Sequence, residues 1–318
     1  MEVTFINVGY GDAMLIEHNG LWALIDGGSG MPEEFTGNRI SLRSYLEKRN
    51  ISRLACAIIT HIHEDHVCGL LETLDHVQIG EFYGPYLPRF DSRDDDHFGS
   101  DLPANITGYI SALNAYRKIF FYAQDHHIPF HNLMEKKSIY PLGEEVPFTI
   151  VEPSTQQTLT YTKRIEQMLS QTDADYRYAL LAALERDSND ASVCIRIGFH
   201  QFSFLLTADN CPTNWREETF SLLENGNVLK LPHHGQIDAV NDRLLKHLGP
   251  DYIVTSSSND HRHNSSNKRV YEKLRSAKEH IQLLFTDEVS YEPFTDTKRM
   301  NLQDLRFLVW DNVISVEL

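Results

Sequence analysis

The feature that most constrains this chain is a cluster of metal-ligand side chains directly after a buried strand. The apolar run at 54–60 predicts the strand, and the cluster that follows it holds His61, His63, Asp65 and His66. Imidazole and carboxylate groups are natural protein ligands of zinc and similar divalent ions. His61 and His63 are two residues apart, so both side chains point the same way from an extended segment. Asp65 and His66 begin the turn beyond, so one segment offers two ligands to each of two ions.

Further candidate ligands follow two later strands. Asp209 ends the apolar strand Phe-Leu-Leu-Thr-Ala, just after the segment 202–207, and a carboxylate there can bridge two ions. His233 and His234 end the strand predicted at 228–231, and we expect one to be a ligand and the other a substrate contact. Two ions about 3.5–4 Å apart can share a bridging hydroxide and clamp both oxygens of a displacement. Metal binding also lowers the pKa of water to about 7, which makes a nucleophile at neutral pH.

Strands and helices alternate in two groups along the chain. Strands are predicted at 3–6, 13–18, 21–25, 54–60, 148–151, 192–197, 202–207, 228–231, 252–255 and 281–285. Helices are predicted at 38–48, 109–122, 161–184, 213–223, 238–247 and 266–277, with Thr213 as one N-cap. Each group of strands ends in histidines or an aspartate, so we expect two similar β/α halves with a site between them. No linker divides the chain, which predicts one domain over 1–318 with insertions near 83–147 and 154–190.

Charge and cysteine content narrow the functional classes. The formal net charge of −16 argues against strong sequence-independent binding of nucleic acid, because such binding depends on Lys and Arg side chains that contact phosphates. Two roles are possible for the basic residues: they form a local phosphate-binding rim, or they belong to the solvated surface. These residues are Lys230, Arg262, Lys268 and Arg269. The four cysteines form no CxxC pair, which favours free thiols in a reducing compartment. With no apolar run long enough for a membrane span, we expect a cytoplasmic protein without a membrane partner; the oligomeric state stays open.

The pattern His61-x-His63-x-Asp65-His66, then Asp209, then His234 resembles the metallo-β-lactamase superfamily. More narrowly, the segments 8–13, 24–28, 60–69, 189–193, 205–209 and 229–235 look like the hydrolase domain of ComEC-type DNA-uptake competence proteins. The resemblance runs from residue 3 to about 285. It implies an α/β (α+β) fold, a four-layer αββα sandwich with helical and loop insertions. The membrane channel of the competence proteins has no counterpart, so DNA import is not implied.

The resemblance also implies roles for single residues. His61, His63 and Asp209 would hold one divalent ion, and Asp65, His66, Asp209 and His234 would hold a second, with zinc or manganese as the metal. The expected catalytic residues are Asp65 and the oxyanion donors His233 and His263. Asp26 would orient a ligand histidine and Asp12 would line the pocket, with a purely structural role as the alternative for each. Asn7, Tyr10 and Cys68 stand where the group often has Asp, Gln and Gly, which predicts a reshaped pocket.

These features predict a hydrolase that uses a metal-bridging hydroxide on a phosphodiester. The ComEC-type resemblance favours DNA or RNA as substrate, whereas the negative net charge favours a small nucleotide or a phosphocholine-type ester. A lactone, thioester or amide hydrolase of the same fold is the alternative, which an apolar pocket lined by residues 82–90 would favour. A third hypothesis is a non-catalytic metal-binding module that uses the two insertions as interfaces.

Overall fold

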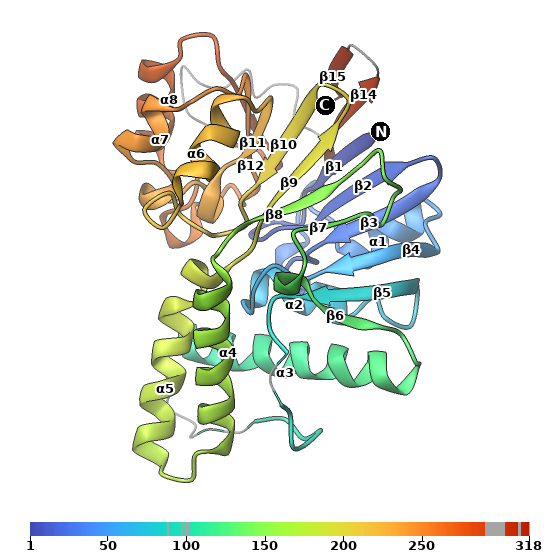
Figure 1. Cartoon of the computed structure of the whole chain (residues 1–318), viewed down its shortest axis with the longest axis vertical. Coiled ribbons are helices and arrows are strands. Elements are labelled where there is room, and N and C mark those ends of the chain that lie inside the picture. The colour runs from blue at the N-terminus through green and yellow to red at the C-terminus, as the bar shows by residue number, and fades with distance from the viewer. Residues whose placement is uncertain (88, 97, 99–101, 290–302, 311–312, 318) are drawn as a thin grey trace.

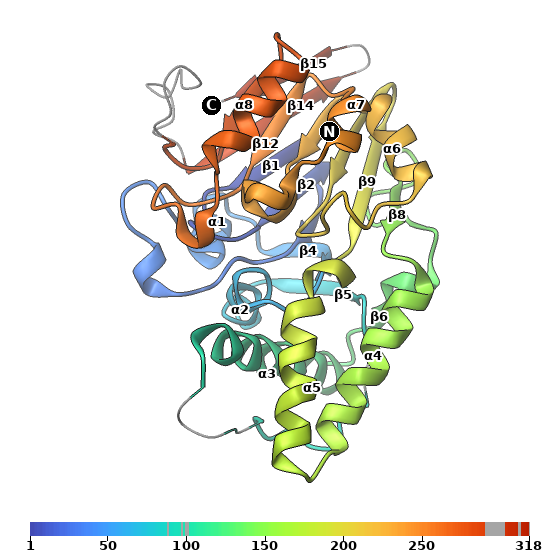
Figure 2. The ribbon, with the colours of Figure 1, turned by 90° about the vertical axis from the view of Figure 1, so that its left-hand side faces the viewer.

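Two β-sheets lie face to face in the computed structural model, and helices cover their outer faces (Figures 1 and 2). The structure describes residues 1–87, 89–96, 98, 102–289, 303–310 and 313–317. The resulting order of layers is helix, sheet, sheet, helix. This confirms the predicted α/β sandwich.

The first sheet has eight strands in the order β15-β14-β1-β2-β3-β4-β5-β6. Its strands are β1 (Glu2–Ile6), β2 (Met14–His18), β3 (Leu21–Ile25), β4 (Arg53–Ile58), β5 (Gln78–Gly84), β6 (Phe130–Asn132), β14 (Asp304–Trp310) and β15 (Val313–Glu317). The helices on its side are α1 (Leu42–Lys48), α2 (Glu64–Leu71) and α3 (Ala104–Asp125). The sequence did not reveal β14 and β15, although β14 pairs antiparallel with the first strand of the chain.

The second sheet has seven strands in the order β13-β12-β11-β10-β9-β8-β7. Its strands are β7 (Ser138–Ile139), β8 (Phe148–Glu152), β9 (Cys194–Phe199), β10 (Phe202–Leu206), β11 (Val228–Lys230), β12 (Tyr252–Thr255) and β13 (Gln282–Phe285). The helices on its side are α6 (Glu217–Glu224), α7 (Asp242–Lys246) and α8 (Lys268–Ala277). Strands β10 to β13 are parallel, so their carboxyl ends share one edge of the sheet.

Three apolar clusters fill the spaces between the four layers. Because side chains alternate across a strand, Phe204 and Leu206 of β10 face the cluster between the sheets, whereas Leu205 faces the helices. The first sheet likewise sends Leu24 outward against the helices and Ile25 inward. Burial on both faces explains why these strands read as continuous apolar runs in the sequence.

A helical hairpin, α4 (Thr155–Ser170) and α5 (Ala174–Asp187), is inserted between β8 and β9 and extends away from the sheets (Figure 1). Ser154 caps α4 in a reciprocal capping box with Gln157, and the Asp173 side chain accepts from the backbone N–H of Tyr176 to cap α5. The prediction of one helix over 161–184 was therefore wrong, because a new N-cap interrupts it. The hairpin packs against α3, which also lies in an expected insertion.

Other helix boundaries also differ from the sequence prediction, and local capping explains most of the differences. Helix α1 begins at Leu42 because Ser41 caps it, and α8 begins at Lys268 because Asn267 caps it. Helix α6 begins at Glu217, so Thr213 is not its N-cap. The segment 238–247 forms a short 3-10 turn, η5 (Ile237–Ala239), followed by α7, which Asn241 caps. Among the described residues, no helix is long and apolar enough to cross a bilayer. The cytoplasmic location stays a prediction.

Candidate metal centre

The N-terminus of α2 is held in place by two glycine-containing loops. The backbone N–H of Gly27 donates to the carbonyl of His66 at 2.7 Å, and the N–H of Gly69 donates to the carbonyl of Gly28 at 2.9 Å. The approach is so close that a Cβ on Gly69 would lie 2.0 Å from the Gly27 oxygen. Gly11 has φ +134, and a Cβ there would lie 2.3 Å from the carbonyl oxygen of Asp65. Because these positions are glycines, the loops can pack directly against the backbone of the helix that carries Asp65 and His66.

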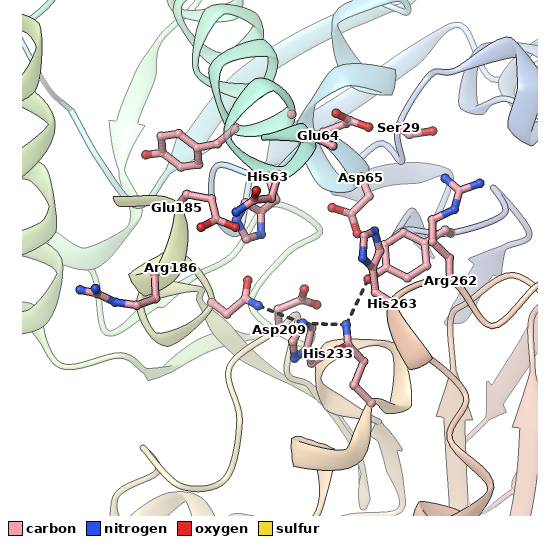
Figure 3. A pocket seen from close by; sticks show the side chains of 17 residues that line it. Ser29, His63, Glu64, Asp65, Glu185, Arg186, Asp209, His233, Arg262 and His263 are labelled. Atoms are coloured by element: carbon pink, nitrogen blue, oxygen red, sulfur yellow. Dashed lines mark hydrogen bonds between the residues drawn. The ribbon is translucent and has the colours of Figure 1, made fainter. Parts of the chain in front are cut away.

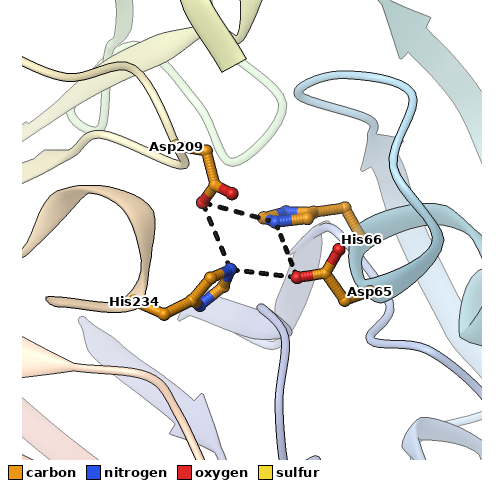
Figure 4. A group of neighbouring side chains, drawn as sticks. All are labelled: Asp65, His66, Asp209 and His234. Carbon is orange, nitrogen blue, oxygen red and sulfur yellow. Dashed lines mark ion pairs between the residues drawn. The ribbon is translucent and has the colours of Figure 1, made fainter. Parts of the chain in front are cut away.

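Four buried ligand atoms from three separate segments face one another (Figure 4). Nε2 of His234 lies 3.0 Å from Oδ2 of Asp65 and 3.3 Å from Oδ1 of Asp209. Nε2 of His66 lies 3.5 Å and 3.4 Å from the same two oxygens. In a tetrahedral zinc site with bonds of about 2.0–2.1 Å, neighbouring ligand atoms lie about 3.3–3.4 Å apart. None of the four atoms has a hydrogen-bond partner among the described residues, so the group fits a divalent ion.

A second group shares Asp209 with the first. His61, His63 and Asp209 also offer ligand atoms within 4.8 Å of one another. Nε2 of His61 lies 3.2 Å from Nδ1 of His63 and 3.9 Å from Oδ2 of Asp209. The two oxygens of Asp209 thus face different groups, Oδ1 toward His66 and His234 and Oδ2 toward His61. This arrangement fits a carboxylate that bridges two ions.

A buried carboxylate orients one ligand from behind. Asp26 accepts a hydrogen bond from Nδ1 of His66 at 2.9 Å and from the Thr60 hydroxyl at 2.7 Å. The same hydroxyl lies 3.1 Å from Nδ1 of His61. With Nδ1 engaged, Nε2 of each histidine is the nitrogen that faces the metal groups. Asp26 is completely buried and has a φ of 57, so the loop holds it in the left-handed region to make this contact.

The turn after β11 separates the two adjacent histidines. His233 and His234 both have left-handed backbone conformations, with φ of 46 and 50. The N–H of His233 donates to the carbonyl of Ala208, and Nδ1 of His234 donates to the carbonyl of Ser256 at 2.7 Å. His234 is buried against Asp65 and Asp209, whereas His233 lines a cavity. His234, not His233, therefore belongs to the group with Asp65, His66 and Asp209.

Two residues expected at the pocket surface lie beneath the centre instead. Lys230 and Asp12 are both completely buried, with Nζ 2.5 Å from Oδ2 of Asp12. The ammonium also donates to the carbonyl of Ala208 at 3.0 Å and lies 3.9 Å from Oδ1 of Asp209. The expectations that Asp12 lines the pocket and that Lys230 belongs to a phosphate-binding rim were wrong, because each neutralises the other in the interior. Lys268 and Arg269 lie on α8 and do not line the cavity.

The charges of the centre favour cations. Burial lowers the pKa of His61 and His63, so both rings are neutral and ready to bind a metal. Burial would also lower the pKa of His66 and His234, but the nearby carboxylates outweigh it: the pKa of His66 rises well above its ordinary value and that of His234 rises to about 10. The pKa of Asp209 is lowered because His234 and His66 outweigh the effect of burial. Protons therefore occupy nitrogens that a metal ion would take.

A cavity of about 430 Å³ opens over the two groups (Figure 3). Its lining includes the expected residues His63, Asp65, Asp209, His233 and His263. It also includes Tyr10, whose ring lies 4.6 Å from that of His234 and 5.3 Å from that of His263, so this substitution does shape the pocket.

The apolar pocket considered for residues 82–90 is not at this place. Phe82 and Tyr86 are fully buried in the cluster between the first sheet and α3, and no described residue of that segment lines the cavity. The observation that would favour a lactone, thioester or amide substrate is therefore missing.

Several cavity residues carried no signal in the sequence. Glu64, Tyr109 and Glu185 line one side, and they come from α2, α3 and α5. Gln236 donates to the Tyr10 hydroxyl at 3.3 Å and lies 2.9 Å from Nε2 of His233. Asn189 Nδ2 lies 3.0 Å from the same nitrogen. Asn189 and Glu64 lie in the segments 189–193 and 60–69, which resemble the ComEC-type hydrolase domain. Tyr109 and Glu185 come from the helical insertions, whereas Glu64 begins α2 and Gln236 follows the turn after β11. Their meeting around one cavity follows from tertiary packing.

A family model described as the metallo-beta-lactamase superfamily matches residues 6–256. The chain belongs to this superfamily. The metallo-β-lactamase fold usually binds two metal ions, and the His/Asp cluster for them is present. A comparison with curated proteins finds no match.

Solved structures share the fold over most of their length. Igni18, a metallo hydrolase from the archaeon Ignicoccus hospitalis, has a TM-score of 0.50 at 14% identity, with 91% of this chain and 97% of that chain covered. An isothiocyanate hydrolase from Delia radicum gut bacteria has a TM-score of 0.50 at 13% identity, with the same coverage of 91% and 97%. At such low identity the likeness shows the metallo-β-lactamase fold and nothing about substrate.

Proposed function

We propose that this metallo-β-lactamase-fold protein is a hydrolase that uses two divalent metal ions, zinc or manganese, to cleave phosphodiesters. The observation that carries the proposal is the pair of ligand groups that share Asp209 beneath one open cavity. His61 and His63 belong to one group, and Asp65, His66 and His234 to the other. When bound, a pair of such ions activates water and neutralises the charge that develops on the phosphoryl oxygens.

The protein's own residues orient the substrate. The carboxylate of Asp238 lies 3.1 Å from Nδ1 of His233 and accepts a hydrogen bond from it, which fixes the orientation of the ring. In the proposed reaction, the ring of His233 and the amide N–H groups of Asn189 and Gln236, which now contact its Nε2, supply hydrogen bonds to a phosphoryl oxygen. His263 adds a second donor from an exposed loop on the same cavity.

The charges on the cavity wall favour a small substrate over a long nucleic acid. Arg262 is already paired with Glu34 and Asp260, and Arg186 with Asp187. Glu64 and Glu185 add two further carboxylates to the cavity wall. Since binding to a polyanionic backbone depends on uncompensated Lys and Arg, we propose a small nucleotide or another compact phosphodiester as substrate. The nuclease activity implied by the ComEC-type resemblance is the competing outcome.

A substrate panel tests this proposal. Metal-free protein is loaded with Zn²⁺ or Mn²⁺ and assayed with bis-p-nitrophenyl phosphate, cyclic nucleotides, single- and double-stranded DNA, a lactone and a thioester. We expect turnover of the small phosphodiesters and a loss of at least about a hundredfold in Asp209→Ala, because losing even an orienting residue behind a ligand costs 10–100-fold.

The matched control is Asp75→Ala, which changes an exposed aspartate away from the cavity. Unchanged turnover by Asp209→Ala would refute the assignment of the bridging residue. Turnover of the lactone or thioester without turnover of any phosphodiester would replace the proposed substrate class.

A further inference from the structure

One of the four cysteines has surroundings unlike those of the others. Cys56, Cys68 and Cys194 each pack in or against an apolar cluster, as free cysteines usually do. Cys211 is also buried, yet it belongs to none of the apolar clusters of the described residues. It follows β10 by a few residues, and its thiol faces polar groups on the turn after β11.

Those polar groups complete a set of metal-ligand side chains. Cys211, His233 and Asp238 offer ligand atoms that all lie within 4.8 Å of one another. Nδ1 of His233 lies 3.1 and 3.2 Å from the two oxygens of Asp238. In a tetrahedral zinc site with bonds of about 2.0–2.3 Å, neighbouring ligand atoms lie about 3.3–3.7 Å apart, so the side chains would move closer together on binding. A thiolate, an imidazole and a carboxylate are three of the ligand types that zinc accepts.

Access to this cluster is independent of the substrate cavity. Half of the Asp238 side chain is exposed, with a relative accessibility of 51%. Neither Cys211 nor Asp238 lines the cavity over the dinuclear groups, whereas His233 does. An ion can therefore reach the cluster from the surface, and solvent can supply its fourth ligand.

We propose that Cys211, His233 and Asp238 form a third metal site, selective for a thiophilic divalent ion such as Zn²⁺, Co²⁺ or Cd²⁺. Binding replaces the thiol proton, which leaves to solvent, and the ion takes the place of the hydrogen bond between His233 and Asp238. A thiolate ligand disfavours Mn²⁺, which prefers oxygen ligands. Because His233 would bind through Nδ1, its single proton would sit on Nε2, the nitrogen directed at the cavity.

Cobalt titration of the metal-free full-length protein tests the proposal. We expect saturation at three cobalt ions per chain and a near-ultraviolet charge-transfer band from a thiolate bound to cobalt. Cys211→Ser should lose the band and bind two ions, whereas Cys68→Ser, the control at a partly exposed cysteine, should keep both the band and the third ion. Manganese should saturate at two ions in every one of these proteins.

Two further variants distinguish this site from the dinuclear centre. They also keep the proposal testable if Cys211→Ser does not fold. Asp209→Ala should lose ions from the shared groups but keep the thiolate band, so the two proposals can fail separately. Asp238→Asn, at the exposed ligand, should raise the cobalt concentration needed for the band by about tenfold or more. Absence of a thiolate band at cobalt saturation, or a band that persists in Cys211→Ser, overturns the third site.

Discussion

Replacing Lys230 by methionine is the sharpest test of the charge arrangement beneath the centre. Lys230 and Asp12 are both 0% exposed, and Nζ lies 2.5 Å from Oδ2 of Asp12. Neither oxygen of Asp12 accepts a hydrogen bond from another described residue. Methionine preserves most of the volume of lysine, so the variant removes the charge and leaves the packing.

The expected cost follows from the uncompensated carboxylate. Removing one partner of a buried ion pair costs about 3–5 kcal/mol, because the remaining charge stays desolvated. At roughly 2 °C per kcal/mol for a large domain, the Tm of Lys230→Met should fall by about 6–10 °C. Thermal unfolding of metal-free protein in a chelator measures this without a contribution from bound ions.

Two further proteins make the Lys230 result interpretable. Lys136→Met changes an exposed lysine without a partner among the described residues and should leave the Tm unchanged. The double variant Asp12→Asn with Lys230→Met should recover more than half of the loss, since no buried charge is left unpaired. A fall of less than 2 °C in Lys230→Met, or no recovery in the double variant, would refute the reasoning.

Three other predictions concern the ligands and their supports. Asp26→Asn should weaken zinc affinity by about 10–100-fold in a competition titration, because His66 loses its carboxylate acceptor. Asparagine tolerates the left-handed backbone at this position, so the loop should keep its conformation. The control is Asp75→Asn at an exposed position. The pKa of His66 is raised in the folded protein, and that of His234 is raised to about 10. Protonation of these two rings therefore stabilises the metal-free protein fully below pH about 6.5, and this stabilisation is lost as the pH rises. The Tm of metal-free protein should fall between pH 6.5 and pH 10, and a rising Tm would contradict this. Gly69→Ala should lower both Tm and zinc content because its Cβ would lie 2.0 Å from a backbone oxygen, whereas Gly108→Ala meets only the flexible tip of Glu64 and should be tolerated.

Much of the centre could be predicted from sequence because its ligands follow buried strands. Strand ends of a sandwich meet at shared edges, so the motif at 61–66, Asp209 and the histidine pair could be expected to converge. Which of His233 and His234 joins Asp65 and Asp209 depends on the left-handed backbone conformation of both histidines. No residue pattern in the sequence predicts that conformation. Lys230 reads as a surface cation in sequence, and only the buried Asp12 beside it explains its place in the interior.

The fold shows a similar division between local and tertiary information. Apolar runs with clear ends predicted the central strands, because burial on both faces leaves no polar alternation to misread. The break between α4 and α5 was missed although the segment 170–175 is mostly polar. The Asp173 cap decides where the new helix begins. Strands β14 and β15 pair with the start of the chain, a long-range contact that local patterns do not encode.

The ligand groups draw on both sheets, with α2 after β4 on one side and the ends of β10 and β11 on the other. During synthesis, the 61–66 segment therefore leaves the ribosome long before the residues at 209 and 234 exist. A nascent chain that ends before residue 209 lacks the shared carboxylate and holds two of the three residues of one ligand group and two of the four of the other. Both ligand groups are therefore complete only after residue 234 has been made and the two sheets have packed together.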